Sequence, residues 1–149
     1  MKQAIRLSIE NVAKGGGPFG AVIVKDGEVI AEASNSVTSS NDPTAHAEIN
    51  SIRQATRKLN TFDLSGCEIY SSCEPCPMCL GAIYWARLDK LYFAGTKTDA
   101  REAGFDDSFI YDELKLDYAD RKLYTRQMMR ENAQEAFEKW RDFEEKIEY

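Results

Sequence analysis

The stretch GAVIVKDGEVIAEA, residues Gly20 to Ala33, decides the fold class. It contains two apolar runs rich in β-branched residues, Gly20–Lys25 and Glu28–Ala33, joined by Asp26-Gly27. Asp-Gly is favoured in a two-residue type I′ turn because both positions require positive φ. We therefore predict an antiparallel β-hairpin over this stretch.

Helices and further strands are predicted on both sides of the hairpin from the spacing of apolar residues. A Gly-Gly-Gly-Pro run ends the first helix, and we expect Thr44 to cap the second. The predicted helices cover residues 2–13, 45–59, 77–86 and 132–146, the further strands cover 68–71, 90–94 and 122–128, and residues 99–120 are expected to be a loop with a short helix near Ser108. This order predicts an α/β fold, a three-layer α/β/α sandwich with a mixed central sheet of about five strands.

The length and composition are those of one soluble domain. The chain has 149 residues, of which 43% are hydrophobic, and this composition excludes an intrinsically disordered protein. No apolar run approaches the roughly 20 residues of a membrane helix. Residues Met1 to Lys14 carry charges throughout, unlike a signal peptide. We expect a single domain, residues 1–149, in the cytoplasm and with no membrane partner.

The net charge weighs against a nucleic-acid partner. The chain has 25 acidic and 19 basic residues, a net charge of −6, and residues 99–120 alone contain eight acidic and two basic residues. Proteins that bind nucleic acid usually present a basic face, because neutralising phosphates supplies most of the affinity. A local basic strip would still be compatible with this charge, but we expect no nucleic-acid partner.

Two short motifs indicate a catalytic zinc site. His46, the only histidine, and Glu48 lie in TAHAE, and Cys76 and Cys79 lie in EPCPMC. Cysteines in a cytosolic chain serve metal binding or catalysis more often than disulfides. Two thiolates and one imidazole suit Zn²⁺, and three protein ligands leave the fourth position for a water whose pKa falls to about 7. We predict one Zn²⁺ per chain with a bound water, and Glu48 as the proton shuttle.

Other uses of these cysteines are open. A lone Cys-x-x-Cys serves redox chemistry or structural zinc in many proteins. An iron–sulfur motif built from Cys73, Cys76 and Cys79 lacks its fourth cysteine, since position 83 is Ile. A closed structural zinc site with Cys73 as the fourth ligand would leave Glu48 without a special role. We interpret Cys67 and Cys73 as small buried side chains.

The His-x-Glu and Pro-Cys-x-x-Cys pattern resembles that of the cytidine deaminase-like superfamily of zinc deaminases. The resemblance covers nearly the whole chain and is greatest to the bacterial guanine deaminases. It is carried by residues 16–27, 41–48, 72–87, 103–111 and the terminal WRDFEEKIEY. It implies a cytidine deaminase-like fold, a homodimer, and a hydrolase that acts on the cyclic amidine C–N bond of guanine to give xanthine and ammonia in purine catabolism or salvage.

The resemblance also implies roles for individual residues toward this small-molecule purine base. Asp107 is the carboxylate that accepts hydrogen bonds from guanine and relays a proton to the leaving amine. Residues 130–149 form a C-terminal helix and tail that act as a lid or dimer element. The other substrate-binding residues implied are Asn35, Phe19, Ala47, Trp85 and Tyr149.

Several alternatives stay open at this point. Asp107 would otherwise be a helix cap, and Trp85 a core residue. The same zinc residues serve guanosine, cytosine and tRNA adenosine deaminases, the last of which needs a basic surface for RNA. A zinc-stabilised binding module without activity is the alternative from another class, and the presence of Glu48 weighs against it.

Overall fold

The computed structural model describes all 149 residues, which form two compact units, Met1–Ser108 and Phe109–Tyr149. The N-terminal unit is built on a four-stranded sheet in the order β2-β1-β3-β4. Strand β1 pairs antiparallel with β2 and β3, and β3 pairs parallel with β4, so the sheet is mixed. The strands are β1 (Gly20–Lys25), β2 (Glu28–Ser34), β3 (Cys67–Cys73) and β4 (Lys90–Gly95).

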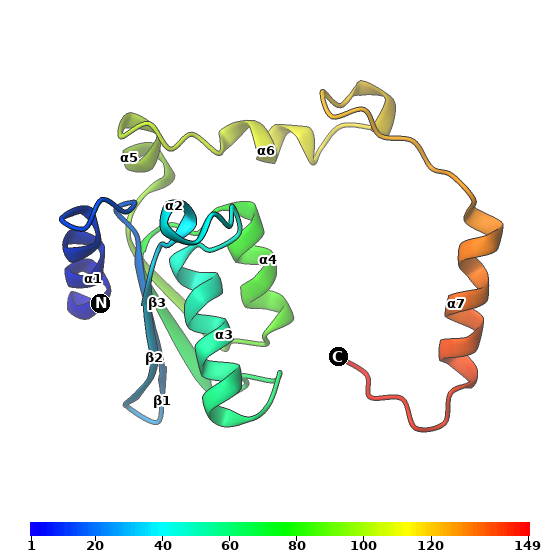
Figure 1. Cartoon of the computed structure of the whole chain (residues 1–149), viewed down its shortest axis with the longest axis horizontal. Helices are drawn as coiled ribbons and strands as arrows, with labels where there is room; N and C mark the ends of the chain where they lie inside the picture. The colour runs from blue at the N-terminus through cyan, green and yellow to red at the C-terminus, as the bar shows by residue number, and fades with distance from the viewer. The chain divides into compact units, whose positions relative to one another are not determined.

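Helices cover both faces of this sheet (Figure 1). Helix α1 (Lys2–Val12) packs on one face, and α3 (Ala47–Leu59) and α4 (Pro77–Trp85) lie on the other. A Cβ atom at Gly20 would lie 2.4 Å from the carbonyl oxygen of Ala4, so α1 approaches β1 as closely as it does only over a glycine. The predicted three-layer α/β/α sandwich is confirmed.

The hairpin at the centre of the prediction is present. Asp26 and Gly27 have φ values of 51° and 82°, as a type I′ turn requires. The two strands are in register from Gly20 opposite Ser34 to Lys25 opposite Glu28, with one irregularity between Ile23 and Val24.

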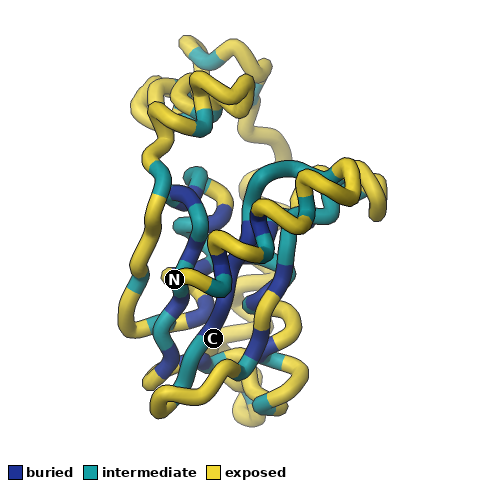
Figure 2. The backbone as a smooth tube through the Cα atoms, turned by 90° about the vertical axis from the view of Figure 1, so that its left-hand side faces the viewer, coloured by how far each residue is buried: buried dark blue, intermediate teal, exposed yellow.

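The hydrophobic core lies between the sheet and helices α3 and α4. All buried residues, dark blue in Figure 2, belong to the N-terminal unit. Burial in β3 alternates with a period of two, so that Cys67, Ile69, Ser71 and Cys73 are buried while the residues between them are partly exposed. The interpretation of Cys67 and Cys73 as small buried side chains is confirmed. Burial also raises the pKa of the Cys73 thiol to about 11. The core thus packs α3 and α4 against the sheet. This packing fixes the positions of the N-terminal ends of the two helices.

Short helices follow the second and fourth strands. Helix α2 (Val37–Ser40) lies in the polar stretch after β2, and α5 (Lys97–Glu102) follows β4. The sequence prediction included neither helix. A capping box starts α5, because the Thr96 and Asp99 side chains each hydrogen-bond to the other's backbone N–H.

The C-terminal unit differs from the prediction in two places. Residues 122–128, predicted as a fifth strand, form no strand, because a strand requires a neighbouring strand to pair its backbone groups and these residues have none. The last helix, α7, spans Arg130–Asp142 and ends where Phe143 becomes extended, rather than covering 132–146. A short helix near Ser108 is present as α6 (Ser108–Glu113), and η1 (Tyr118–Asp120) follows it. None of the helices has the length and hydropathy that a membrane span requires.

Candidate active site

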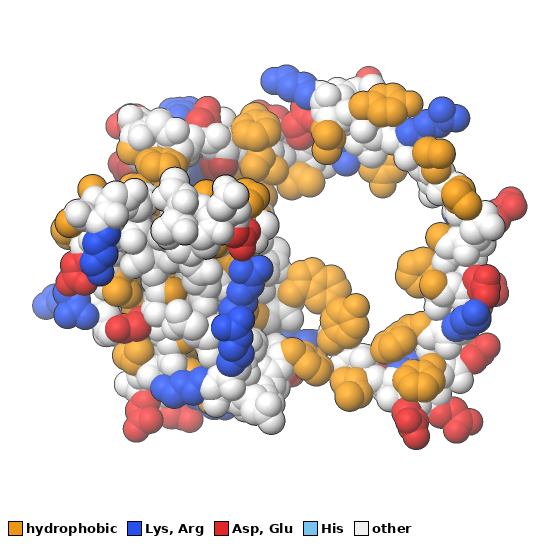
Figure 3. Space-filling view, in the orientation of Figure 1, with side chains coloured by type: hydrophobic (Ala, Val, Ile, Leu, Met, Phe, Trp, Pro, Cys, Tyr) orange, Lys and Arg blue, Asp and Glu red, His pale blue; other side chains and the backbone are white.

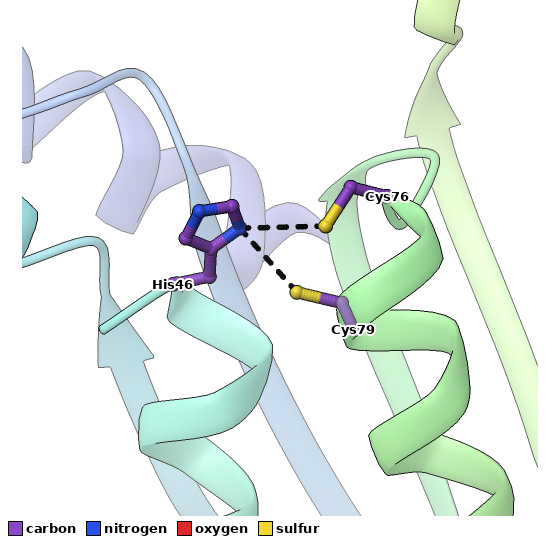
Figure 4. Close-up of side chains that lie close together, drawn as sticks. All are labelled: His46, Cys76 and Cys79. Atoms are coloured by element: carbon purple, nitrogen blue, oxygen red, sulfur yellow. Dashed lines mark hydrogen bonds between the residues drawn. The ribbon is translucent and has the colours of Figure 1, made fainter. Parts of the chain in front are cut away.

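The N-terminal ends of α3 and α4 bring three potential metal ligands together (Figure 4). His46 and Cys76 are the N-cap residues of these two helices, and Cys79 lies in the first turns of α4. The Nδ1 atom of His46 lies 3.6 Å from the Sγ atom of Cys76 and 3.4 Å from that of Cys79. All three ligand atoms lie within 4.8 Å of one another.

The prediction that Thr44 caps this helix is wrong. Helix α3 begins at Ala47 with His46 as its N-cap. The Thr44 hydroxyl instead donates to Asp42 Oδ1 at 2.7 Å, in the turn that precedes the helix. His46 therefore leaves the helix end in an extended conformation, which lets its ring reach the two cysteines.

The ligand geometry fits zinc. With Zn–S and Zn–N bonds of about 2.3 and 2.0 Å, a tetrahedral ion holds its nitrogen and sulfur ligands about 3.5 Å apart. The two observed N···S distances, 3.6 and 3.4 Å, match this separation. Two thiolates and one imidazole are also the donors that a catalytic zinc uses, with one position left for water.

The electrostatics of the cysteine pair favour a cation as well. Hydrogen bonds from Cys79 and His46 lower the pKa of the Cys76 thiol to about 4. The pKa of Cys79 is raised, chiefly because its proton is held by the Cys76 thiolate and because Cys79 is buried. The lowered pKa of Cys76 favours a thiolate that attracts a cation, and a bound divalent ion would permit both thiols to ionise.

Glu48 lies directly beside the ligand cluster. Its side chain is on the first turn of α3, and the residue is only 6% exposed. One carboxylate oxygen accepts a hydrogen bond from the Ser71 hydroxyl at 2.9 Å, and the other accepts from the Cys79 thiol at 3.5 Å. Burial raises the pKa of this carboxyl group. A buried carboxyl group with a raised pKa is suited to accept and release a proton.

A cavity of about 570 Å³ opens in front of these groups. Its lining includes two of the metal-ligand candidates and Glu48, together with three of the residues assigned to substrate by resemblance, Asn35, Phe19 and Asp107. Burial raises the pKa of the Asp107 carboxyl group. The Phe19 ring packs edge-on against the ring of Phe105, with centroids 5.0 Å apart. The cavity thus combines an apolar wall with converging carboxylate and amide groups.

Three residues from the prediction lie elsewhere. Ala47 is fully buried in the first turn of α3 and is not among the cavity-lining residues. Trp85 ends α4, is 67% exposed and does not line the cavity, so it is not the core residue that was considered as its alternative. Tyr149 is the last residue of the C-terminal unit. The substrate roles of all three stay predictions.

Other residues of the site were absent from the sequence prediction. Ser71, the hydrogen-bond donor to Glu48, occupies an inward-facing position of β3, which period-two alternation from Ile69 would have indicated. Residues Gly15 to Gly17 also line the cavity, as do Glu74 and Lys97. No local pattern signals the last two, because β3 and β4 bring them together and their ion pair at 3.9 Å joins the ends of those strands.

The similarity to known proteins agrees with this site. Residues 1–95 match the family model of the cytidine and deoxycytidylate deaminase zinc-binding region. The guanine deaminase of Bacillus subtilis (strain 168) is 53% identical and is aligned over 100% of this chain and 96% of its own length. A tRNA-specific adenosine deaminase of Aquifex aeolicus is 44% identical over 79% of this chain and 78% of its own length.

Two solved structures lead to the same family. The X-ray structure of the guanine deaminase from Bacillus subtilis has a TM-score of 0.96 and 54% identity, over 99% of this chain and 95% of that chain. A structure of the guanine deaminase from Nitrosomonas europaea has a TM-score of 0.67 and 37% identity, over 70% of this chain and 61% of that chain. His46, Glu48 and Cys76 line one cavity, and Cys79 lies beside His46 and Cys76. With this site and these similarities, the chain belongs to the cytidine and deoxycytidylate deaminase family of zinc-binding proteins.

Proposed function

We propose that the protein is a zinc-dependent hydrolase that converts guanine and water to xanthine and ammonia. The observation that carries this proposal is the position of Asp107 in the same cavity as Glu48, His46 and Cys76. A substrate carboxylate and a proton-transfer carboxylate are thus available at one metal site. Full-length similarity to the guanine deaminase of Bacillus subtilis supports the same substrate.

Guanine and adenine differ in what they offer to Asp107. Guanine presents N1–H and its 2-amino group as donors, and a carboxylate accepts both. Adenine has an acceptor at N1, so its binding would leave the carboxylate facing a lone pair. A site built for a hydrogen-bonding edge rejects an analogue that lacks the matching donors strongly.

The proposed chemistry follows from the positions of Glu48 and Asp107. His46, Cys76 and Cys79 would hold the zinc, which would lower the pKa of a bound water to about 7. Glu48 accepts a proton from water at its carboxylate and delivers it to N3 of the purine, which makes C2 more electrophilic. The water oxygen bonds to C2, and its remaining proton passes through Glu48 or Asp107 to the 2-amino group. The C2–N bond then breaks as the C2=O bond of xanthine forms, and ammonia is released.

Other residues bind the base in this proposal. Asn35 contacts the edge of the purine away from Asp107, and Phe19 packs against the ring. Ala47 is buried and does not line the cavity, so its contact with the substrate is assigned by resemblance alone. Trp85 is assigned a ring contact by resemblance alone.

We further propose a role in substrate closure or dimer formation for residues 130–149, including Tyr149. No residue of the C-terminal unit is buried, and hydrophobic side chains are visible along its surface (Figure 3). On α7, Phe137 and Trp140 are 59% and 42% exposed. An apolar helix face of this kind is stabilised when another surface covers it. We expect a cytoplasmic homodimer.

A substrate panel tests the proposal. Zinc-loaded protein is mixed separately with guanine, guanosine, adenine, cytosine and a tRNA anticodon stem, and ammonia release is measured, with a Glu48→Ala protein as the control. We expect release from guanine alone and none from the control. Release only from the RNA stem would make the protein a tRNA adenosine deaminase, and release only from guanosine would show that the pocket accepts a ribose. No release from any substrate, with zinc bound, would favour a binding module.

A further inference from the structure

We infer that Asn11, which lies outside the cavity, is a positioning residue that holds two walls of the base-binding pocket in place; this inference rests on the proposed function. Asn11 is in the last turn of α1 and is half-buried. Its Nδ2 atom donates to the carbonyl oxygens of Gly17 and Asn35, each at 2.8 Å. Both protons of one amide group are therefore used on backbone acceptors.

The two acceptors belong to segments that are far apart in the sequence. Gly17 lies in the glycine segment between α1 and β1, whereas Asn35 directly follows β2. Both residues line the cavity, as does Phe19 between them, and Asn11 does not. Asn11 thus holds two residues of the cavity wall through their backbone but does not itself face the cavity, so we expect no direct contact with the base.

Asn35 is fixed at three points by this arrangement. Its N–H donates to the carbonyl oxygen of Phe19 at 3.0 Å, and its own carbonyl oxygen accepts from Asn11. The Asn35 side-chain oxygen accepts from the N–H of Val37 at 3.3 Å, which orients the carboxamide. The bond from Asn11 is the one that ties the Asn35 backbone to α1, so it contributes to the position of Asn35 in the cavity wall.

The fit between Asn11 and the glycine segment is close. The Asn11 carbonyl oxygen accepts from the N–H of Gly16 at 2.9 Å. A Cβ atom at Gly16 would lie 2.4 Å from the Asn11 Nδ2 atom, a contact that no side chain tolerates. Gly16 is therefore required for the Asn11 amide to reach both carbonyl oxygens. An added methyl group at Gly16 would displace the same amide.

The expected consequence is a change in base binding rather than in chemistry. The metal ligands and Glu48 lie on α3 and α4, and none of them has a hydrogen bond to Asn11 among the contacts found. Loss of the Asn11 bonds should move Asn35 and the glycine segment while zinc and Glu48 stay in place. KM for guanine should then rise while kcat changes little.

The test uses Asn11→Asp, with Asn11→Ala as a milder variant and Ser8→Ala as the matched control. Aspartate has nearly the same shape but places carboxylate oxygens against two carbonyl oxygens, so both hydrogen bonds are lost. Ser8→Ala removes one side-chain hydrogen bond within the same helix, from the Ser8 hydroxyl to the Ile5 carbonyl oxygen. For Asn11→Asp we expect KM to rise about tenfold or more, with kcat within about threefold of the unsubstituted protein. Ser8→Ala should leave both unchanged.

Amide hydrogen exchange supplies a readout that does not depend on turnover. The N–H of Phe19 donates to Gly17 and that of Asn35 donates to Phe19, so both amides should exchange faster in the two Asn11 variants and at the usual rate in Ser8→Ala. Zinc content and Tm are measured on the same samples. If Asn11→Asp does not fold, Asn11→Ala carries the same comparison with a smaller expected rise in KM.

Each outcome decides one of the two claims. Guanine turnover with unchanged KM in both Asn11 variants would overturn the positioning role, as would a parallel fall in kcat, zinc content and Tm, which marks a purely structural residue. No turnover of guanine by the unsubstituted protein would instead overturn the proposed function. In that case unchanged exchange at Phe19 and Asn35 would also overturn the inference, and faster exchange would support it.

Discussion

The two units of the molecule differ in how far they bury their apolar residues. In the N-terminal unit, helices on both faces of the sheet bury a core that includes Ile23, Leu64 and Ile69. In the C-terminal unit no residue is buried, although Phe137 and Trp140 share its longest helix. Burial of apolar area is the main source of folding free energy. The first unit is thus stabilised by its own core and contains the site. The second unit has no core of its own and would be stabilised by another surface that covers its apolar side chains.

Removal of zinc should produce the largest effect and should act on the N-terminal unit. Cys79 is fully buried, so a metal bound to it would contribute to the stability of the surrounding core. A site at a thousandfold excess of zinc over Kd loses about 4 kcal/mol of stabilisation when the metal is chelated, and deaminase activity should be abolished. Each unit contains one tryptophan, Trp85 in the first and Trp140 in the second.

These tryptophans allow the units to be followed separately. Thermal unfolding is recorded by fluorescence in Trp140→Phe and Trp85→Phe proteins, with and without a chelator. We expect the chelator to lower the Tm reported by Trp85, in the Trp140→Phe protein. The Tm reported by Trp140, in the Trp85→Phe protein, should change less. Equal Tm changes at both tryptophans would show that the units unfold together. The proposed difference in stability between the two units would then be wrong.

Glu48→Gln should separate chemistry from stability within the N-terminal unit. Loss of a general acid–base group lowers kcat by about 10²–10⁴-fold. Glutamine keeps the volume and an oxygen that accepts from Ser71, so zinc content and Tm should change little. Ammonia release, metal analysis and Tm are compared with Glu28→Gln, an exposed substitution of the same type near the hairpin turn. Unimpaired turnover in Glu48→Gln would remove Glu48 from the mechanism.

Tyr149→Ala tests whether the C-terminal unit contributes to the site. Stacking of an aromatic ring on a base is worth about 1–3 kcal/mol, so KM for guanine should rise about tenfold or more. Tyr149→Phe keeps the ring and should preserve most of the binding. Steady-state kinetics of both variants provide the measurement, with Tm unaffected in either. Identical KM values in the alanine variant and the unsubstituted protein would contradict the lid.

The capping box of α5 should produce the smallest effect. Thr96→Ala removes an N-cap, a change that costs about 1 kcal/mol, and α5 contributes Lys97 and Ala100 to the cavity wall. Hydrogen bonds from the Thr96 backbone and hydroxyl lower the pKa of Asp99. This interaction is therefore complete above the pKa of Asp99 in the unfolded chain and is lost as the pH falls through its lower folded-state pKa.

Amide exchange within α5 checks this prediction. In the unsubstituted protein, the amides of Asp99 and Ala100 should exchange faster, relative to α3, once the pH drops below about 4. Thr96→Ala should show the faster exchange already at neutral pH. A pH response that is the same in both proteins would show that the cap does not hold the helix.

Local patterns in the sequence were sufficient for most of the fold and for the cluster of potential metal ligands. Asp26-Gly27 determines its hairpin because the turn depends on two adjacent φ angles. Cys76 and Cys79 predict a shared site because the start of one helix presents both sulfurs. The same reasoning failed for Thr44, whose hydroxyl had a nearer partner in Asp42, and for the strand predicted over residues 122–128, which has no neighbouring strand to pair with.

Contacts between distant segments were decided only by the tertiary structure. Ser71 reaches Glu48 across 23 positions of the chain, and Asn11 reaches Asn35 across 24. No periodicity or spacing encodes such a pair, because it exists only after the sheet has aligned its strands and α1 has packed against them. The sequence by itself therefore determined most of the elements and which chemistry the potential zinc ligands and Glu48 support. The packing of those elements decided which side chains orient that chemistry, because a hydrogen bond forms only where the folded backbone places donor and acceptor within reach.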